Sequence, residues 1–298
     1  MKNLTKKQID FLNKYTKGSW TYNPSTGLVD VNGEFDCSGS RVKTLSGIKF
    51  GKVSSDFACP GNDLTSLEGA PQEVGGSFYC DDNKLTSLKG APQEVGGDFV
   101  CEENQLTSLE GAPKKVGGSL NCSENELTSL EGAPKKVGGS FQCYYNKLTS
   151  LDGAPQEVLG DFWCSCNKLI DLDGAPQKVG WSFWCFGNNL TSLKGAPQKV
   201  GGSFQCYYNE LTSLKGAPQE VGGNFWCYYN KLTSLDGAPP KVGGSFDCSR
   251  NELIDLKGAP QKVGDEFITD AFRIRGNSPE YVIEDLIDRL RLHTLGLA

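Results

Sequence analysis

The sequence repeats itself every 21 residues, and this period limits what the chain can fold into. The run that starts at Val74, Val-Gly-Gly-Ser-Phe-Tyr-Cys-Asp-Asp-Asn-Lys-Leu-Thr-Ser-Leu, returns in closely similar form at Val95. Cysteines keep the same interval, at positions 59, 80, 101, 122, 143, 164, 185, 206, 227 and 248. Repeats of this length stack into solenoids, in which each repeat buries its apolar side chains only against its neighbours. The period therefore predicts a solenoid that grows along one axis.

The Phe-x-Cys segment of each repeat alternates inward and outward positions, as in a short β-strand. Stacked copies would pair in parallel, with phenylalanine and cysteine facing inward, in a sheet of about 12 strands. The Asn three residues after each Cys is expected to satisfy backbone groups left unpaired at a turn, because its amide both donates and accepts. Pro in the Gly-Ala-Pro segment forbids a helix there. The sequence therefore predicts a β-rich solenoid with a non-helical convex side.

The segment Phe78-Tyr-Cys80-Asp-Asp-Asn83-Lys-Leu85-Thr-Ser-Leu88 resembles the leucine-rich repeat pattern L-x-L-x-x-N-x-L-x-x-L. Phe78 and Cys80 take the first two leucine places. The 21-residue period is similar to that of the short bacterial class of these repeats, and the Leu-Thr-Ser-Leu-x-Gly-Ala-Pro form looks like repeats of uncharacterised phage and environmental bacterial proteins. The resemblance implies a leucine-rich-repeat-like parallel sheet and a binding role. Gly-Ala-Pro replaces the Leu-Pro segments of bacterial effector repeats.

Both ends of the chain depart from the period and are expected to be helical caps, which solenoids need to close their end repeats. Thr5 and Gln8 have capping-box spacing at the start of a short amphipathic helix, and a hairpin follows around Asn23–Gly27. Ser278 and Pro279 have the N-cap and first-turn positions of a final helix. We expect an N-terminal cap over 1–30, the solenoid over 31–269 and a C-terminal cap helix over 270–298.

Composition and charge restrict the function. The net charge of −6 argues against a nucleic-acid partner, since phosphate contacts need clustered Lys and Arg. The first 16 residues lack the apolar core of a secretory signal, and no apolar run is long enough to span a membrane. The repeated cysteines therefore suggest reduced, buried thiols in a cytoplasmic protein. Cys166, an additional cysteine in an outward position, is a candidate reactive thiol.

Catalytic and metal-binding patterns are missing from the sequence. His293, the only histidine, lies beyond the repeats, and no phosphate loop or Cys/His metal spacing is present. The sequence therefore predicts a non-enzymatic protein with neither a cofactor nor a bound metal. It leaves the oligomeric state open.

We call the cysteines of the Phe-x-Cys segments the ladder cysteines. The outward positions that flank them vary between repeats and divide the strand face into two zones. Five acidic residues occupy three adjacent repeats: Asp81, Asp82, Glu102, Glu103 and Glu124. Ten aromatic residues occupy the next five repeats: Tyr144, Tyr145, Trp163, Trp184, Phe186, Tyr207, Tyr208, Trp226, Tyr228 and Tyr229. The core does not require these aromatics, because other repeats carry Ser, Asn or Gly in the same positions.

The aromatic zone has several interpretations. Aromatic side chains provide most of the binding energy of many protein interfaces, and an exposed apolar patch of this size usually marks a binding site. We therefore expect a protein partner, and the resemblance to phage and bacterial repeats suggests a host factor. Stabilisation of the sheet by stacked rings is the structural alternative. Trp and Tyr platforms also bind carbohydrates or nucleotide-like small molecules. For the acidic zone, a solvated face, a basic partner and a hard cation all remain open.

Overall fold

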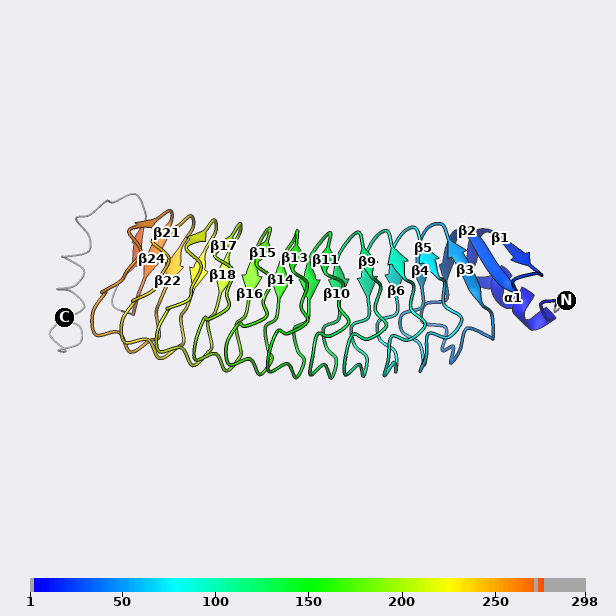
Figure 1. Ribbon diagram of the computed structural model, residues 1–298, viewed down its shortest axis with the longest axis horizontal. Helices are drawn as coiled ribbons and strands as arrows, with labels where there is room; N and C mark the ends of the chain where they lie inside the picture. The colour runs from blue at the N-terminus through cyan, green and yellow to red at the C-terminus, as the bar shows by residue number, and fades with distance from the viewer. Residues whose placement is uncertain (1–2, 271–272, 276–298) are drawn as a thin grey trace. The chain divides into compact units, whose positions relative to one another are not determined.

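The structure is a computed structural model that describes residues 3–270 and 273–275. The chain divides into two compact units. The first consists of residues 1–147 and 153–155, and the second of residues 148–152 and 156–298. Each unit is a parallel β-solenoid in which successive turns of the chain place equivalent strands side by side (Figure 1). Within each unit, parallel stacking brings residues 21 positions apart into register.

The first unit begins with a helix and a hairpin and continues as solenoid turns. Its elements are α1 (Lys6–Tyr15), β1 (Thr16–Asn23), β2 (Leu28–Asp36), β3 (Phe50–Val53), β4 (Phe57–Ala58), β5 (Glu73–Val74), β6 (Phe78–Tyr79), β7 (Glu94–Val95), β8 (Phe99–Val100), β9 (Lys115–Val116), β10 (Leu120–Asn121), β11 (Lys136–Val137) and β12 (Phe141–Gln142).

The second unit continues the same pattern, and the last described elements are an antiparallel strand pair, β24–β25. Its elements are β13 (Glu157–Val158), β14 (Phe162–Trp163), β15 (Lys178–Val179), β16 (Phe183–Trp184), β17 (Lys199–Val200), β18 (Phe204–Gln205), β19 (Glu220–Val221), β20 (Phe225–Trp226), β21 (Lys241–Val242), β22 (Phe246–Asp247), β23 (Lys262–Val263), β24 (Glu266–Ile268) and β25 (Arg273–Arg275).

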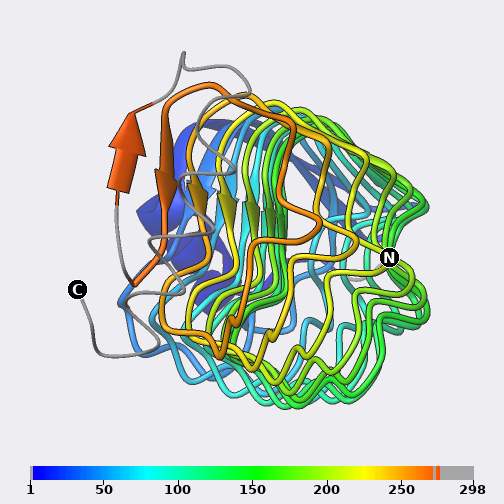
Figure 2. The same ribbon diagram turned by 90° about the vertical axis from the view of Figure 1, so that its left-hand side faces the viewer.

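Most turns contribute two short strands, where the sequence predicted one. The additional strand contains the valine that precedes Gly-Gly; Val74, for example, is buried and pairs in register with Val95. The described residues consequently form 25 strands instead of about 12. The predicted non-helical side is present in the described turns, where bends and turns follow the strands. Figure 2 shows the strands on one side of the turns and irregular backbone on the other.

The core consists of side-chain columns, each with one member per turn. The phenylalanine, cysteine and leucine columns have almost no solvent exposure, except in the last described turns, where Leu253 and Phe267 are partly exposed. In the first unit, Phe57 and Phe78 stack with 5.3 Å between ring centroids, and in the second unit Phe204 and Phe225 stack at 5.5 Å. Burial of apolar area on this scale is the main source of stability in such a fold.

The asparagine column forms the predicted hydrogen-bond ladder. Asn83 donates from Nδ2 to the carbonyl oxygens of Cys59 at 2.9 Å and Cys80 at 3.2 Å. Its Oδ1 accepts the backbone N–H of Leu64 at 2.9 Å. One amide therefore joins two successive turns and satisfies buried backbone groups that no strand pairs. Equivalent bonds recur in the second unit, as at Asn209.

The N-terminal helix starts at the predicted capping box. The N–H of Gln8 donates to Thr5 Oγ1 at 3.3 Å, and the N–H of Thr5 donates to Gln8 Oε1 at 2.9 Å. The predicted hairpin is also present, as the antiparallel pair β1–β2. The final helix predicted after Ser278 lies outside the described residues.

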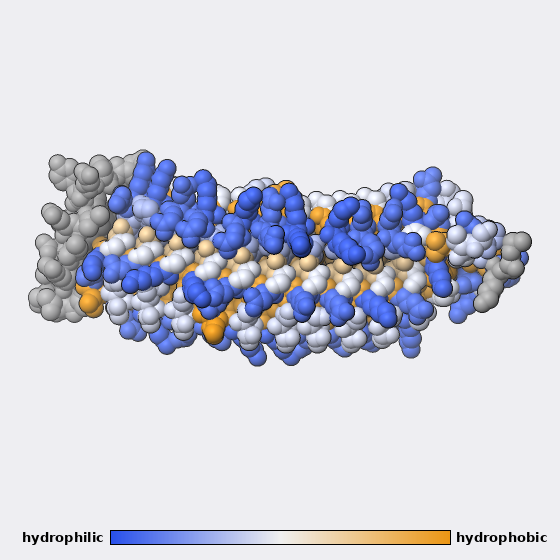
Figure 3. Space-filling view, viewed as in Figure 1, coloured by the Kyte–Doolittle hydropathy of each residue, from blue (hydrophilic) through white to orange (hydrophobic). Residues whose placement is uncertain are grey.

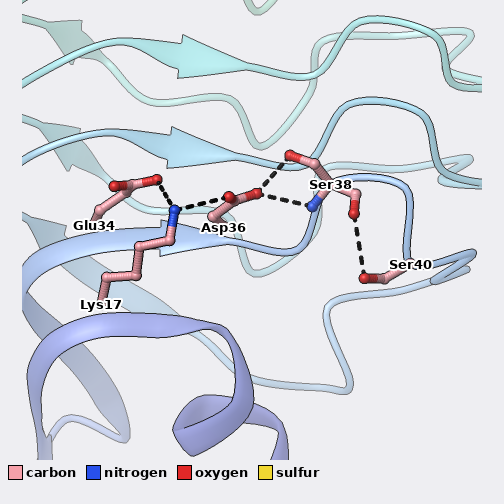
Figure 4. Close-up of polar contacts among 5 residues, drawn as sticks. All are labelled: Lys17, Glu34, Asp36, Ser38 and Ser40. Atoms are coloured by element: carbon pink, nitrogen blue, oxygen red, sulfur yellow. Dashed lines mark hydrogen bonds and ion pairs between the residues drawn. The ribbon is translucent and has the colours of Figure 1, made fainter.

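A polar cluster joins the hairpin to the first turn of the solenoid (Figure 4). Lys17 contacts Glu34 at 2.9 Å and Asp36 at 3.1 Å, and Asp36 accepts the backbone N–H of Ser38 at 3.0 Å. The bonds from Ser38, followed by that from Lys17, lower the pKa of Asp36. Asp36 thus fixes the backbone at the end of β2.

Hydrophilic side chains follow the stacked turns in rows, separated by paler and more hydrophobic rows (Figure 3). In the first unit, Lys115 pairs with Glu94 at 2.7 Å, and in the second Lys199 pairs with Glu220 at 2.7 Å. Such exposed pairs contribute little stability. No helix among the described residues is long and apolar enough to cross a membrane.

Candidate binding surface

The predicted aromatic residues occupy both units. Tyr144 and Tyr145 belong to the first unit, where their rings meet edge to face with 5.8 Å between centroids. Tyr145 is 60% exposed. The other eight lie on the second unit, and we call them the aromatic surface: Trp163, Trp184, Phe186, Tyr207, Tyr208, Trp226, Tyr228 and Tyr229.

The rings of the aromatic surface form stacks that follow the turns. Trp163 and Trp184 stack with 4.2 Å between centroids and 8° between planes. Phe186, Tyr207 and Tyr228 form a continuous stack, with 4.5 Å between the centroids of each adjacent pair. The register of the parallel strands places equivalent residues of adjacent turns next to each other. The aromatic surface is therefore a set of ordered ring stacks on consecutive turns.

A further stack consists of residues with a left-handed backbone. Tyr208 and Tyr229 have φ values of 51° and 52°, and their rings stack at 4.5 Å. Left-handed φ values are sterically unfavourable for residues with a Cβ atom, especially bulky ones. Gly187 occupies the same column with a φ of 66°, so this position can also hold glycine, the residue that adopts a left-handed backbone without steric cost. The tyrosines therefore carry a backbone cost that the fold does not require.

The phenol groups of the central stack are neutral at physiological pH. Burial raises the pKa of Tyr228 to about 12, and the neighbouring Tyr207 adds to the increase. Burial also raises the pKa of Tyr207. Neutral hydroxyl groups can donate and accept hydrogen bonds at the edge of an apolar surface, as aromatic side chains do in many interfaces.

The predicted acidic residues lie together on the first unit. Asp82, Glu103 and Glu124 are exposed and have φ values of 48°, 51° and 53°, which puts them in the same left-handed column as the tyrosines. Asp81 and Glu102 are half-buried, and burial is the main cause of their raised pKa values. Among the described residues, no group of three or more His, Cys, Asp or Glu side chains could hold a metal ion.

The thiols divide into two classes. The eleven ladder cysteines are buried, whereas Cys166 has intermediate exposure. Burial raises the pKa of ladder thiols such as Cys80 well above the ordinary value, and that of Cys37 to about 12. A thiol with a raised pKa is a poor nucleophile because little thiolate is present. Cys166 therefore differs from the ladder in accessibility.

Sequence reasoning missed four exposed apolar residues of the second unit, Leu159, Ile170, Trp181 and Ile254, of which two depart from the Gly-Gly segment. Trp181 is 65% exposed and Leu159 is 46% exposed. Leu159 and Trp181 each replace a glycine of the Gly-Gly segment, and this departure from the repeat could have identified them from the sequence. Gln205 was also left out, although the strand register places it between Trp184 and Trp226.

A groove of about 870 Å³ lies on the first unit, along the start of β5, β7, β9 and β11. Glycines and exposed Lys and Glu side chains line it. Several of these charges compensate one another, since Lys52 pairs with Glu73 at 3.4 Å and Lys115 with Glu94 at 2.7 Å. The predicted acidic and aromatic residues do not line this groove.

No protein-family model matches the sequence, and no curated protein sequence matches it. Among solved structures, the functional domain of InlJ from Listeria monocytogenes, which includes a cysteine ladder, is similar over 79% of this chain, with 24% identity and a TM-score of 0.55. The chain has a leucine-rich-repeat-like fold. That likeness is one of fold, and the cysteine columns of this chain fit it.

Two structures of YopM also match, with lower scores. YopM from Yersinia enterocolitica WA-314 is 16% identical over 79% of this chain, with a TM-score of 0.44. The leucine-rich effector YopM from Yersinia pestis is 14% identical over 80%, with a TM-score of 0.40. The matched region spans 53% of the InlJ chain, and 63% and 83% of the two YopM chains. The comparisons give no support to the relation with phage proteins that the sequence suggested.

Proposed function

We propose that this protein is a non-enzymatic repeat scaffold that binds a protein partner through its aromatic surface. The observation that carries the proposal is the stack of Tyr208 on Tyr229, two exposed rings whose residues both have a left-handed backbone. The fold does not require tyrosine here, because Asp82, Glu103 and Glu124 have the same left-handed backbone without a ring stack, and glycine would avoid the steric cost. Exposed, ordered aromatic rings supply contact area at low entropy cost, which favours recognition.

The leucine-rich-repeat-like fold supports the same proposal, because solenoids present extended surfaces for binding. Tyr144 and Tyr145, on the first unit, were also predicted as binding residues from the sequence, and their role stays a prediction. The rival function is capture of a carbohydrate or nucleotide-like molecule by a few rings. A protein interface would bury a total area of roughly 1,600 Å², much more than a small ligand covers.

Site-specific cross-linking tests the proposal. A photo-crosslinking phenylalanine derivative would replace Tyr208 in one sample and Glu103, which has the same column position on the first unit, in a control. In extract from the native host, we expect a discrete protein adduct from position 208 and none from position 103. Equal adducts from both positions, or no protein adduct from position 208, would refute a protein-binding aromatic surface.

A further inference from the structure

A single amide interrupts the indole column of the aromatic surface. On four consecutive turns, the position before the ladder cysteine holds Trp163, Trp184, Gln205 and Trp226. Trp163 stacks on Trp184, and the strand register then pairs Trp184 with Gln205 and Gln205 with Trp226. Gln205 therefore occupies the place of a third indole, with a tryptophan on the turn before it and another on the turn after it.

Gln205 is buried although its position faces outward. It is 7% exposed, and both neighbours in sequence, Phe204 and Cys206, face the core. Since its own position points away from the core, the flanking side chains of the aromatic surface must provide this burial. The amide is thus the polar centre of a mainly aromatic environment.

Hydrogen-bonding capacity at this centre is unmet. Two shorter polar residues of the same column fold back on the chain: Asn121 accepts the N–H of Ser123 at 3.1 Å, and Asp247 accepts that of Ser249 at 3.0 Å. Within the described ranges, Gln205 makes no side-chain hydrogen bond. The indole N–H of Trp184 is buried without an acceptor, whereas the Gln205 amide is not among the fully buried unpartnered atoms and therefore keeps some contact with solvent. A buried polar group without a partner is unfavourable, so the N–H of Trp184 calls for an explanation, and a ligand can still reach the Gln205 amide.

A ligand amide would meet this requirement. The Gln205 side chain offers two donor hydrogens on Nε2 and an acceptor on Oε1. A second amide complements both groups at once, whereas a carboxylate offers only acceptors and an ammonium or guanidinium group only donors. The rings of Phe186, Tyr207 and Tyr228 form an apolar strip over three consecutive turns, which suits the flanking side chains of an extended segment.

We infer that Gln205 is the specificity-determining residue of the aromatic surface, and that it recognises an amide of an extended peptide segment, in particular an Asn or Gln side chain. This inference rests on the proposed function, and it names the partner chemistry at the same surface. The partner segment would place one amide between Trp184 and Trp226 and apolar side chains on the neighbouring stacks. Gln205 acts in binding, and no chemical step is involved.

A peptide library provides the test without a known partner. Blocked heptapeptides would carry Asn, Gln, Leu or Glu at the central position and amino-acid mixtures elsewhere. Binding to the purified full chain would be measured on a peptide array, and dissociation constants of the best sequences by calorimetry. We expect central Asn or Gln to bind about tenfold more tightly than central Leu, which is the usual effect of one good polar pair.

Two variants separate recognition from folding. Gln205→Leu should abolish the preference for a central amide and keep the native unfolding midpoint. Gln142→Leu is the matched control, because Gln142 has the same Phe-Gln-Cys-Tyr-Tyr context, but its register partner on the preceding turn is Asn121 and not a tryptophan. This control should keep the preference unchanged.

The outcomes distinguish this inference from the proposed function. Peptide binding that needs Tyr208 and Tyr229 but ignores the central residue, or an amide preference that survives Gln205→Leu, would overturn the inference and leave the proposed function standing. Binding of chitohexaose, whose acetamido groups carry amides, with no binding of any peptide pool, would overturn both. No binding of either probe would also count against both.

Discussion

Tyr208 and Tyr229 stack at 4.5 Å, with 13° between their ring planes, while both residues keep a left-handed backbone. The two features have opposite effects on stability. A ring stack between neighbouring turns stabilises the solenoid by about 0.2–1 kcal/mol, as cross-strand pairs do in sheets, whereas a left-handed L-residue costs roughly 1–2 kcal/mol. The net effect of these tyrosines on folding is therefore expected to be small, which supports the proposed role in recognition.

Tyr208→Gly should change the free energy of unfolding by less than about 0.5 kcal/mol, because relief of the left-handed backbone offsets the lost stack. Tyr207→Gly is the control. Tyr207 stacks on both Phe186 and Tyr228 and has no left-handed backbone to relieve. Its loss should lower the free energy of unfolding by roughly 1–2 kcal/mol in urea titrations. A similar large loss for Tyr208→Gly would contradict the argument.

The asparagine ladder predicts a sharp contrast between two adjacent residues. Asn188→Ala should lower the free energy of unfolding by about 1–3 kcal/mol, because it removes bonds to the carbonyl oxygens of Cys164 and Cys185, both at 3.1 Å. Asn189→Ala, at an exposed position, should change it by less than about 0.5 kcal/mol. Equal shifts in the denaturant midpoint would show that the ladder bonds do not matter.

Thiol labelling of the native protein should modify Cys166 first. A maleimide, read out by intact-protein mass spectrometry, should add one label rapidly, and Cys166→Ser should remove this rapid phase. The ladder thiols should react only after denaturation, because burial removes access and raises their pKa. Rapid labelling that persists in Cys166→Ser would place the accessible thiol in the ladder instead.

Stability should depend on pH through the acidic residues of the first unit. Burial, together with neighbouring carboxylates, raises the folded-state pKa of Asp81 and Glu102. Each carboxyl thus binds protons more tightly in the folded chain, so its contribution to the free energy of unfolding falls as the pH rises through the folded pKa.

Asp81→Asn combined with Glu102→Gln should therefore raise the urea midpoint at pH 7. The gain over the wild type should shrink as the pH falls through the folded pKa values, because protonation then neutralises the same groups. Glu110→Gln, at an exposed site outside the acidic zone, should leave the urea midpoint at pH 7 unchanged. If the stability gain of the double variant grew as the pH fell, the predicted direction of the pH dependence would be wrong.

Much of the fold follows from the spacing of particular residues. The phenylalanine and cysteine columns and the bonds of Asn83 follow from the period, because identical turns must bury identical positions. The second strand at Val74 was missed because it has a single buried side chain and glycines follow it, so it lacks the alternation that identified Phe-x-Cys. The capping box at Thr5 was recognisable because it depends only on local contacts.

The candidate surface was only partly predictable. Departures from the period identified the aromatic residues, because no core position demands them. The left-handed backbone of Tyr208 could not be read from its own sequence context, although glycine in the same column was a signal. The role of Gln205 depends on neighbours 21 residues away on both sides, Trp184 and Trp226, and on burial that only the structure shows.

The most direct test of the account removes the aromatic surface and measures folding and binding on the same sample. Tyr207→Ser, Tyr208→Glu, Trp226→Asn, Tyr228→Ser and Tyr229→Glu would together install residues that the chain already uses at these positions, as in Asn121-Cys-Ser-Glu124. The account predicts a variant that still unfolds cooperatively, is less stable by roughly 1–3 kcal/mol through the lost stacks of Tyr207 and Tyr228, and no longer binds the protein identified by cross-linking. A variant that unfolds at a much lower temperature, yet still binds that protein with wild-type affinity when folded, would contradict the account.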